Sequence, residues 1–274
     1  MWKKIKKMNF VTIFAFAVLL IVIGMVLFPS LFTSYDPLEV DMSKKLIGPC
    51  AEHWLGTDEY GRDIFCRIVY GARSSVLVGL GTAALSALIG VPLGLIAGYF
   101  GGTVDNVIMR IMDAFQSFPS ILLAILLSTI FNTSVQSLIL TISAVSFPRF
   151  AKLVRSNVLV IKKQDYVAAA QIAGVSKSYI LFNSILRNCM SVVVVQFSML
   201  TATAILIEAG MSFLGLGLQP PAPAWGSMLF YANKYINSNI SYVLSPTFTI
   251  FLVVLSINLL GDALRDKLDP KKKK

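Results

Sequence analysis

Five long stretches without a single charged residue restrict what this chain can fold into. They cover residues 8–35, 74–104, 114–148, 188–207 and 235–261. Each is at least as long as the ~20 apolar residues that carry a helix across a bilayer, and 114–148 has room for most of two helices. Only 14% of all residues are charged, which is too few to cover the surface of a soluble domain. Since hydrocarbon offers no partner to backbone N–H and C=O groups, these stretches are predicted to be helices.

The expected fold class is an all-α integral membrane protein, a bundle of about six transmembrane helices. We place these helices near 9–33, 74–99, 104–131, 135–157, 188–213 and 242–263, with a polar turn at 132–134. The basic start of the chain resembles a signal peptide, but the apolar run after it is too long and ends in no small-residue cleavage site. It is therefore interpreted as an uncleaved first helix.

The distribution of Lys and Arg predicts which segments lie in the cytoplasm. With the N-terminus inside, 18 of the 24 basic residues fall on the inner side, and the outer segments 34–73 and 214–241 hold the other six. Both termini are then cytoplasmic. The net charge of +10 is interpreted as a sign of topology and of contact with anionic lipid, with nucleic-acid binding a poor alternative.

This topology divides the chain into three parts. Residues 1–73 form an N-terminal cytoplasmic tip, the first transmembrane helix and an outer loop. Residues 74–264 form a core of about five helices with an inner loop at 158–187, and 265–274 form a basic cytoplasmic tail.

The inner loop contains an alanine-rich turn that runs into a glycine. We expect a short helix to end at Gly174 in the left-handed conformation, and a second amphipathic helix to run from Ser176 to about Leu186. Small alanines allow close approach and Tyr166, Val167 and Ile172 offer apolar contact, so the elbow suits a cytoplasmic partner. An ordinary interfacial helix is the alternative, and spacing alone does not separate the two.

This loop resembles the "EAA" coupling loop of ABC-importer permeases. Ala168, Ala169, Ala170 and Gly174 match the pattern, followed by Ile185 and Leu186; Ala168 stands where the pattern has Glu and Arg187 where it has Pro. Four further segments are similar to the dipeptide/oligopeptide/nickel permease family. They are HWLGTDEYGRDIF at 53–65, MRIMD at 109–113 with Phe118-Pro119, SFLGLG at 212–217 followed by PPAPAWG at 220–226, and NLLGDALRDKLDP at 258–270.

The resemblance implies the second, "C-type" permease of an ATP-driven importer in the bacterial cytoplasmic membrane. The expected partners are a second permease subunit, two ATPase subunits, an extracytoplasmic solute-binding protein and membrane lipid, with no nucleic acid. The chain contains no Gly-x4-Gly-Lys-Ser/Thr loop, so ATP and Mg are expected on the ATPase subunits and no cofactor on this chain. It is not expected to be an enzyme. The predicted ATPase-coupling residues are Asp165, Tyr166, Val167, Ala168, Ala169, Ala170 and Gly174, with Asp165 a possible substitute for the missing Glu.

Glu208 is the candidate pore residue, because an acid at membrane depth is costly unless it faces water, a partner or the pore. An acid close enough to the headgroups to be hydrated is an equal alternative. His53 is the only histidine, and a metal site needs several nitrogen or sulfur ligands, so no metal site is predicted and His53 is interpreted as an interfacial hydrogen-bonding residue.

The outer loop combines aromatic residues, glycines and paired charges. Trp54, Tyr60, Phe65 and Tyr70 suit the headgroup level, and Asp58, Arg62 and Asp63 can tie the loop to itself or to a delivering protein. A structural cap is favoured over a substrate site. Cys50 and Cys66 share this loop and can pair, but two unpaired thiols are favoured, and Cys189 is expected to act as a small apolar residue.

Two ionic groups near the inner mouth are interpreted as structural pins. Arg110 is expected to pair with Asp113 near Asp105, and Asp262, Arg265 and Asp269 are expected to behave likewise. Glycines at 90, 94 and 98 favour close helix packing, and prolines at 92, 119, 148 and 246 favour bent helices.

Two other classes of function fit the sequence less well than an importer permease for di- and oligopeptides. An intramembrane enzyme needs a metal or nucleophile cluster at membrane depth, and the chain has no His-Glu-x-x-His and no Gly-x-Ser-x-Gly. An ion-coupled secondary transporter places several ionisable groups in mid-membrane, where Glu208 is nearly alone. Among cargoes, nickel or a metal chelate is the alternative to peptides.

Overall fold

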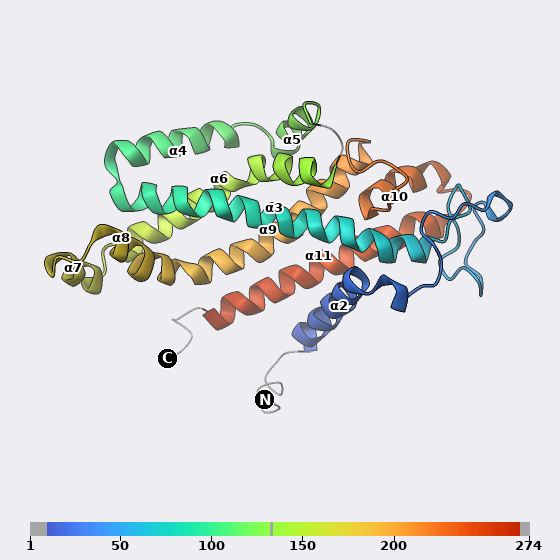
Figure 1. Ribbon diagram of the computed structural model, residues 1–274, viewed down its shortest axis with the longest axis horizontal. Coiled ribbons are helices and arrows are strands. Elements are labelled where there is room, and N and C mark those ends of the chain that lie inside the picture. The colour runs from blue at the N-terminus through green and yellow to red at the C-terminus, as the bar shows by residue number, and fades with distance from the viewer. Residues whose placement is uncertain (1–9, 132–133, 269–274) are drawn as a thin grey trace.

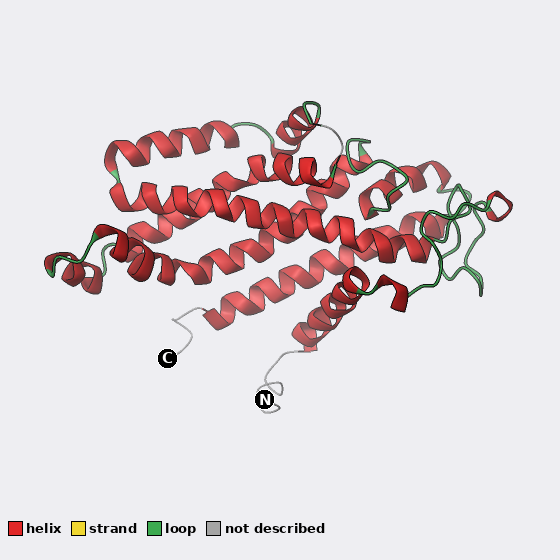
Figure 2. Cartoon of the chain, viewed as in Figure 1, coloured by secondary structure: helices red, strands yellow, loops and turns green. Residues whose placement is uncertain are grey.

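The computed structural model describes residues 10–131 and 134–268 as a bundle of long helices with loops at its ends (Figures 1 and 2). Residues 1–9, 132–133 and 269–274 lie outside the described residues, and with them the predicted N-terminal tip, most of the polar turn and most of the basic tail. The long helices are α2 (Phe10–Leu27), α3 (Ile64–Phe100), α4 (Gly102–Gln116), α5 (Ser120–Ser128), α6 (Val135–Ile161), α9 (Arg187–Phe213) and α11 (Ile240–Leu268). The short elements are η1 (Pro29–Leu31), η2 (Met42–Lys44), α7 (Asp165–Ile172), α8 (Lys177–Tyr179), η3 (Ile180–Leu186), α10 (Trp225–Ala232) and η4 (Asn233–Tyr235).

Five helices in the described residues are long and apolar enough to cross a membrane: α2, α3, α6, α11 and the continuous helix Lys177–Phe213. The pair α4 and α5 is the sixth crossing when it is counted as one span. The predicted fold class, an all-α bundle of about six transmembrane helices, is confirmed.

The third crossing is not the single helix predicted near 104–131 but two helices, and the bend expected at Pro119 separates them. The chain bends by 83° between α4 and α5. Pro119 precedes the first residue of α5, and a proline disfavours the helical conformation of the residue before it, here Phe118. The two helices therefore meet at a corner.

Helix α3 begins at Ile64 rather than near 74. Asp63 caps it, because its Oδ1 accepts a hydrogen bond from the N–H of Cys66 at 2.6 Å. The predicted start near 74 was wrong because it excluded the charged residues before it from the helix. Arg67 is in fact buried within α3, where it donates a hydrogen bond to the carbonyl of Pro37 at 2.8 Å. The second span thus includes part of the segment that was predicted as loop.

The glycine repeat brings α3 against α6. A Cβ atom built on Gly98 would lie 2.7 Å from Cβ of Val158, and one built on Gly94 would overlap the carbonyl oxygen of Ala151. Phe150, Val154 and Val158 of α6 complete the buried cluster beside this contact. The predicted close packing is confirmed, and α3 and α6 form the centre of the bundle.

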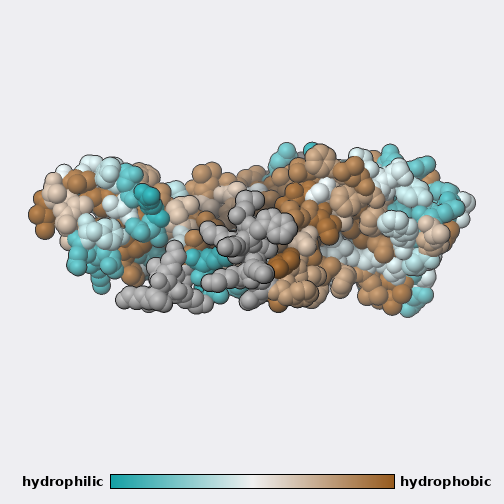
Figure 3. All heavy atoms as spheres, turned by 90° about the horizontal axis from the view of Figure 1, so that it is seen from below, coloured by the Kyte–Doolittle hydropathy of each residue, from teal (hydrophilic) through white to brown (hydrophobic). Residues whose placement is uncertain are grey.

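The two ends of the bundle differ. The end that carries α7 and α8, here called the elbow end, projects beyond the other helices, and the opposite end is covered by the folded loop before α3, here called the cap end (Figure 1). Between the ends, α2 and α11 expose large apolar side chains such as Phe16, Leu20 and Phe251, as expected of surfaces in contact with lipid. Figure 3 shows an apolar area toward the cap end of one face and more hydrophilic residues at the extremities.

Candidate functional site

The elbow is built by a glycine that ends α7. Gly174 has φ +75°, a conformation that residues with a Cβ rarely adopt, and the space around it is open. Its N–H donates to the carbonyl of Gln171, and the N–H of Val175 donates to that of Ala170, both at 3.1 Å. This pair of bonds is a Schellman motif, and it confirms the left-handed helix end predicted at Gly174.

One face of α7 holds the elbow to the bundle. Val167 is fully buried and packs in the cluster that contains Val158, Ile180 and Ile185, with Ala170 and Val175 beside it. These contacts come from α6 and from the segment after the elbow. Because Val167 is an anchor, its side chain is not available to a partner.

The opposite face of α7 is exposed and largely apolar. Asp165, Ala168, Ala169 and Ile172 lie at the spacing of one helix face, and Ile172 is 88% exposed. Tyr166 flanks this face, and its hydroxyl accepts a hydrogen bond from Asn188 Nδ2 at 3.2 Å. Partial burial raises the pKa of the Tyr166 phenol. Of the predicted coupling residues, Val167 is a buried anchor, whereas Asp165, Ala168 and Ala169 lie on an exposed surface. These three residues and Ile172, which was not among the predicted coupling residues, are here called the docking face.

The segment after the elbow runs into the membrane helix without a break. The predicted separate helix from Ser176 to Leu186 is instead the start of one helix from Lys177 to Phe213, with a π-helical segment at Ile180–Leu186. Ile180 and Ile185 are both buried, and a π-helix brings residues five apart onto one face. Arg187 has the backbone N–H that a proline would lack, and it donates to the carbonyl of Ile185. The segment that follows the elbow is therefore continuous with α9.

At the cap end, a buried ion network holds the loop together. Asp58 is fully buried and its Oδ2 lies 2.6 Å from Nε of Arg62 and 3.5 Å from Nε of Arg67. Glu59 accepts a hydrogen bond from the hydroxyl of Tyr242 at 2.8 Å, which ties the loop to α11. The loop is thus tied to itself and to the bundle, as the structural-cap interpretation predicted.

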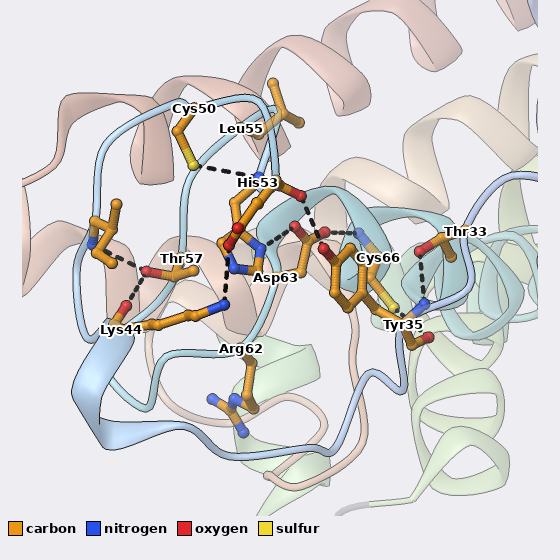
Figure 4. Close-up of polar contacts among 12 residues, drawn as sticks. Thr33, Tyr35, Lys44, Cys50, His53, Leu55, Thr57, Arg62, Asp63 and Cys66 are labelled. Atoms are coloured by element: carbon orange, nitrogen blue, oxygen red, sulfur yellow. Dashed lines mark hydrogen bonds and ion pairs between the residues drawn. The ribbon is translucent and has the colours of Figure 1, made fainter.

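His53 and the two outer cysteines belong to the same cap (Figure 4). Nδ1 of His53 lies 2.9 Å from Oδ2 of Asp63, the residue that caps α3. Cys66 is buried and donates to the carbonyl of Tyr35, whereas Cys50 is exposed, and both are free thiols as predicted. Within the described residues, no group of three or more His, Cys, Asp or Glu side chains is arranged to hold a metal ion.

Around the cap's buried centre lies a solvent-exposed ion pair. Nζ of Lys44 donates to Oε2 of Glu52 at 3.0 Å. This bond lowers the pKa of Glu52 and raises the pKa of Lys44. Two side chains at or just before the start of α11 also hold the cap loop. Asn239 donates hydrogen bonds to the carbonyls of Ile47 and Thr57, and Ser241 donates one to the carbonyl of Leu55.

The predicted pin between Arg110 and Asp113 is not formed. Asp113 pairs instead with Lys152 of α6 at 2.6 Å, and Asp105 pairs with Arg155 through two hydrogen bonds. Arg110 is exposed. Both acids therefore pin α4 to α6. The basic residues of α6 recur every three residues in the sequence, but that spacing did not predict that they pair with the acids of α4. In the second predicted pin, Asp269 lies outside the described residues.

Glu208 is completely buried in a junction of α9, α3 and α10. The hydroxyl of Ser212 donates to its Oε1 at 2.7 Å. Close by, the N–H of Trp225 donates to the hydroxyl of Ser75, and a Cβ atom built on Gly226 would lie 2.7 Å from Cβ of Ser212. Glu208 thus lies in a helix contact of this chain, and its role in the pore stays a prediction.

A cavity of about 600 Å³ lies between α4, α5, α6 and α9. Its polar lining side chains are Gln116, Ser120, Ser146, Arg149 and Thr203, and apolar residues such as Leu200 and Ile207 complete it. Glu208, adjacent in sequence to Ile207, is not among the lining residues. In the sequence, Arg149 falls among the basic residues predicted for the inner side, and nothing in its pattern predicts a cavity residue.

These features define a class of protein: a polytopic helical membrane protein with a projecting docking elbow at one end and a folded cap at the other. Comparison with known proteins then identifies the family. The family described as "Binding-protein-dependent transport system inner membrane component" matches residues 90–274, and the chain belongs to it. The chain is therefore a permease subunit of an ABC importer and not an enzyme. It is a multi-pass inner-membrane protein that works with ATPase and substrate-binding components.

Similar proteins include curated relatives and solved structures. The chain is 44% identical over 272 residues to a dipeptide transport system permease protein of Alkalihalophilus pseudofirmus, covering 99% of this chain and 89% of the relative. It is 45% identical over 226 residues to a glutathione transport system permease protein of Pectobacterium atrosepticum, covering 82% and 75%. An inward-facing structure of the MetNI methionine ABC transporter has the same fold, with a TM-score of 0.62 and 19% identity, covering 74% of this chain and 96% of the other.

Proposed function

We propose that this chain forms the transport path for di- and oligopeptides together with a different, second permease subunit, and that its elbow binds an ATPase subunit in the cytoplasm. Two ATPase subunits bind ATP and Mg, and this chain binds no cofactor. A solute-binding protein delivers the peptide at the cap end, and both termini lie in the cytoplasm.

The observation that carries the coupling role is the docking face of α7. It is exposed, and apolar apart from Asp165, on an element that projects beyond the bundle, while Val167 fixes that element to the core from the other side. An exposed apolar helix face on a rigid support suits insertion into a groove of another protein. Ala168 replaces the acidic residue of the coupling pattern, so apolar contact supplies the docking, with Asp165 at the first turn of α7 as the nearby acid.

Elbow docking is tested by placing a charge on the exposed face. Ile172→Asp is expected to abolish association with the ATPase subunits and peptide uptake, because a carboxylate in an apolar contact loses its hydration without gaining a partner. The measurement is co-purification of the ATPase subunits with the tagged permease, together with uptake in reconstituted vesicles.

Leu38→Asp is the matched control, since Leu38 is an exposed apolar residue of the loop before α3, and that loop covers the end of the bundle opposite the elbow. It is expected to retain the ATPase subunits. Normal co-purification of the ATPase subunits with the Ile172→Asp variant would contradict the docking role.

The relatives' names support a peptide cargo. They specify dipeptides and glutathione, which favours a peptide over nickel or a metal chelate. The same importer, reconstituted with its solute-binding protein, is therefore expected to take up a labelled dipeptide in an ATP-dependent manner. Uptake of a nickel chelate but of no peptide would overturn this cargo.

A further inference from the structure

Arg149 lies close to the middle of a membrane-spanning helix. It is fourteen residues from the first residue of α6, Val135, and twelve from the last, Ile161. At ~1.5 Å per residue, both ends of the helix are roughly 20 Å away. The side chain is exposed in the single chain and faces the 600 Å³ cavity. A guanidinium within a membrane-spanning helix is costly unless it meets water or an anion, so its position marks a candidate functional surface.

The neighbouring cations of α6 provide an internal comparison. Lys152 pairs with Asp113, and Arg155 pairs with Asp105, both acids of α4. Arg149 is the next cation at the same spacing of three, but no described residue forms a hydrogen bond or ion pair with it. Helix α4 ends at Gln116, and the 83° bend then turns the chain away. The bend between α4 and α5 therefore leaves the cavity open beside Arg149, the one of these three cations that has no acidic partner among the described residues.

The cavity has the chemistry of a small anion site. No acidic side chain lines it, so the potential at Arg149 is positive and uncompensated. Ser120 and Ser146 provide hydroxyl groups nearby, while the hydroxyl of Thr203 already donates to the carbonyl of Met199. A volume of about 600 Å³ is of the size that holds a small molecule.

We infer that Arg149 binds the carboxylate of the peptide as it passes through the permease. This inference rests on the proposed function, since every di- or oligopeptide with a free C-terminus carries that group. A guanidinium presents two N–H groups in the plane that a carboxylate accepts, so Arg149 forms a bidentate pair that a lysine cannot reproduce. The pair orients the peptide between α5, α6 and α9 during transport.

The test uses the assembled importer, with a cysteine introduced at Thr203 as a reporter of cavity occupancy. Cys50 is replaced by serine, since it is the exposed native thiol, whereas Cys66 and Cys189 are buried. A neutral maleimide modifies Thr203→Cys, and the rate is measured with increasing concentrations of a dipeptide or of its C-terminal amide. The dipeptide is expected to slow modification at lower concentration than the amide.

Arg149→Gln is expected to weaken protection by the dipeptide by about tenfold or more, the effect of losing a charge-assisted pair, and to leave protection by the amide unchanged. Arg149→Lys is expected to restore part of the effect. Arg110→Gln is the control, because Arg110 is an exposed cation of α4 that does not line the cavity. In this variant the dipeptide is expected to protect the cysteine at 203 as well as it does in the parent.

Three results would overturn the inference: no protection by the dipeptide, equal protection by dipeptide and amide, or loss of the second permease subunit from the Arg149→Gln complex. The last would show that Arg149 pairs with an acid of that subunit. Failure of the proposed function is a separate result, seen as absence of ATP-dependent dipeptide uptake by the unmodified importer.

Discussion

At the scale of single residues, the missing side chains of three glycines set how closely the two central helices approach. At Gly94 the nearest atoms are the backbone oxygen of Ala151 and the Cβ of Val154, neither of which can move without shifting α6. Gly210 offers a contrast within the same bundle, because its nearest neighbour is the flexible end of Ile121 at 3.6 Å.

Gly94→Ala is therefore expected to lower the free energy of unfolding by about 1–3 kcal/mol, the usual effect of overpacking. Gly210→Ala is expected to leave stability unchanged or slightly higher, since alanine favours the helix. Thermal unfolding of both variants in the same detergent measures the difference. Equal melting temperatures would contradict the role assigned to Gly94.

The glycine spacing was visible in the sequence because it is periodic, but the partner helix was not. Sequence spacing also suggested Arg110 as the partner of Asp113, since the two lie on one helix. The observed partner, Lys152, is distant in sequence, and only the packing of α4 on α6 brings it within reach. Glu208 shows the same limit, because a buried acid in a helix junction and an acid in a pore have the same sequence context.

At the scale of elements, the cap is a folded unit with its own buried charges. Asp58 stands between Arg62 and Arg67, so its removal takes the nearest counter-charge from Arg67 and leaves Arg62 with only its longer pair to Glu59 at 3.6 Å. Asp58 and Arg62 were recognisable as a possible pair from their spacing. The other members of the network could not be predicted in this way. Arg67 was expected in a loop, and Tyr242 belongs to α11, far along the sequence.

Asp58→Asn is expected to destabilise the cap by about 3–5 kcal/mol, as expected when one partner of a buried ion pair is lost. Limited proteolysis of the loop and thermal unfolding of the purified protein measure this effect. Lys44→Gln is the control, because its pair with Glu52 is exposed to solvent, and it is expected to behave as the parent. Equal protease resistance of the two variants would show that the network does not hold the loop.

The helical composition of the bundle follows from five uncharged stretches, but the corner between α4 and α5 does not. Hydropathy averages over a window and cannot register a change of direction within an apolar run. Phe118-Pro119 was noted as a motif and Pro119 as a source of bending, yet the size of the bend depends on what α5 packs against. The cavity beside the bend between α4 and α5 therefore could not be predicted from the sequence.

At the scale of the whole molecule, the elbow and the cap lie at opposite ends, so they must face opposite sides of the membrane. The proposed orientation predicts that a membrane-impermeant maleimide labels Cys50 in intact cells, since Cys50 is the exposed thiol of the cap. A cysteine at Ile172, in a Cys50→Ser background, is expected to be labelled only after the membrane is permeabilised. Labelling of Ile172→Cys in intact cells would reverse the topology and remove the docking proposal.

The π-helical segment between the elbow and α9 also fixes a rotational phase. Each residue of an α-helix turns the chain by about 100°, so one residue more or fewer between Ile180 and Leu186 would rotate α7 around the axis of α9 by roughly that angle. Ile172 and the rest of the docking face would then point in a different direction while the membrane bundle kept its shape. In the proposed coupling role, the seven residues of this segment set the side from which an ATPase subunit approaches the bundle.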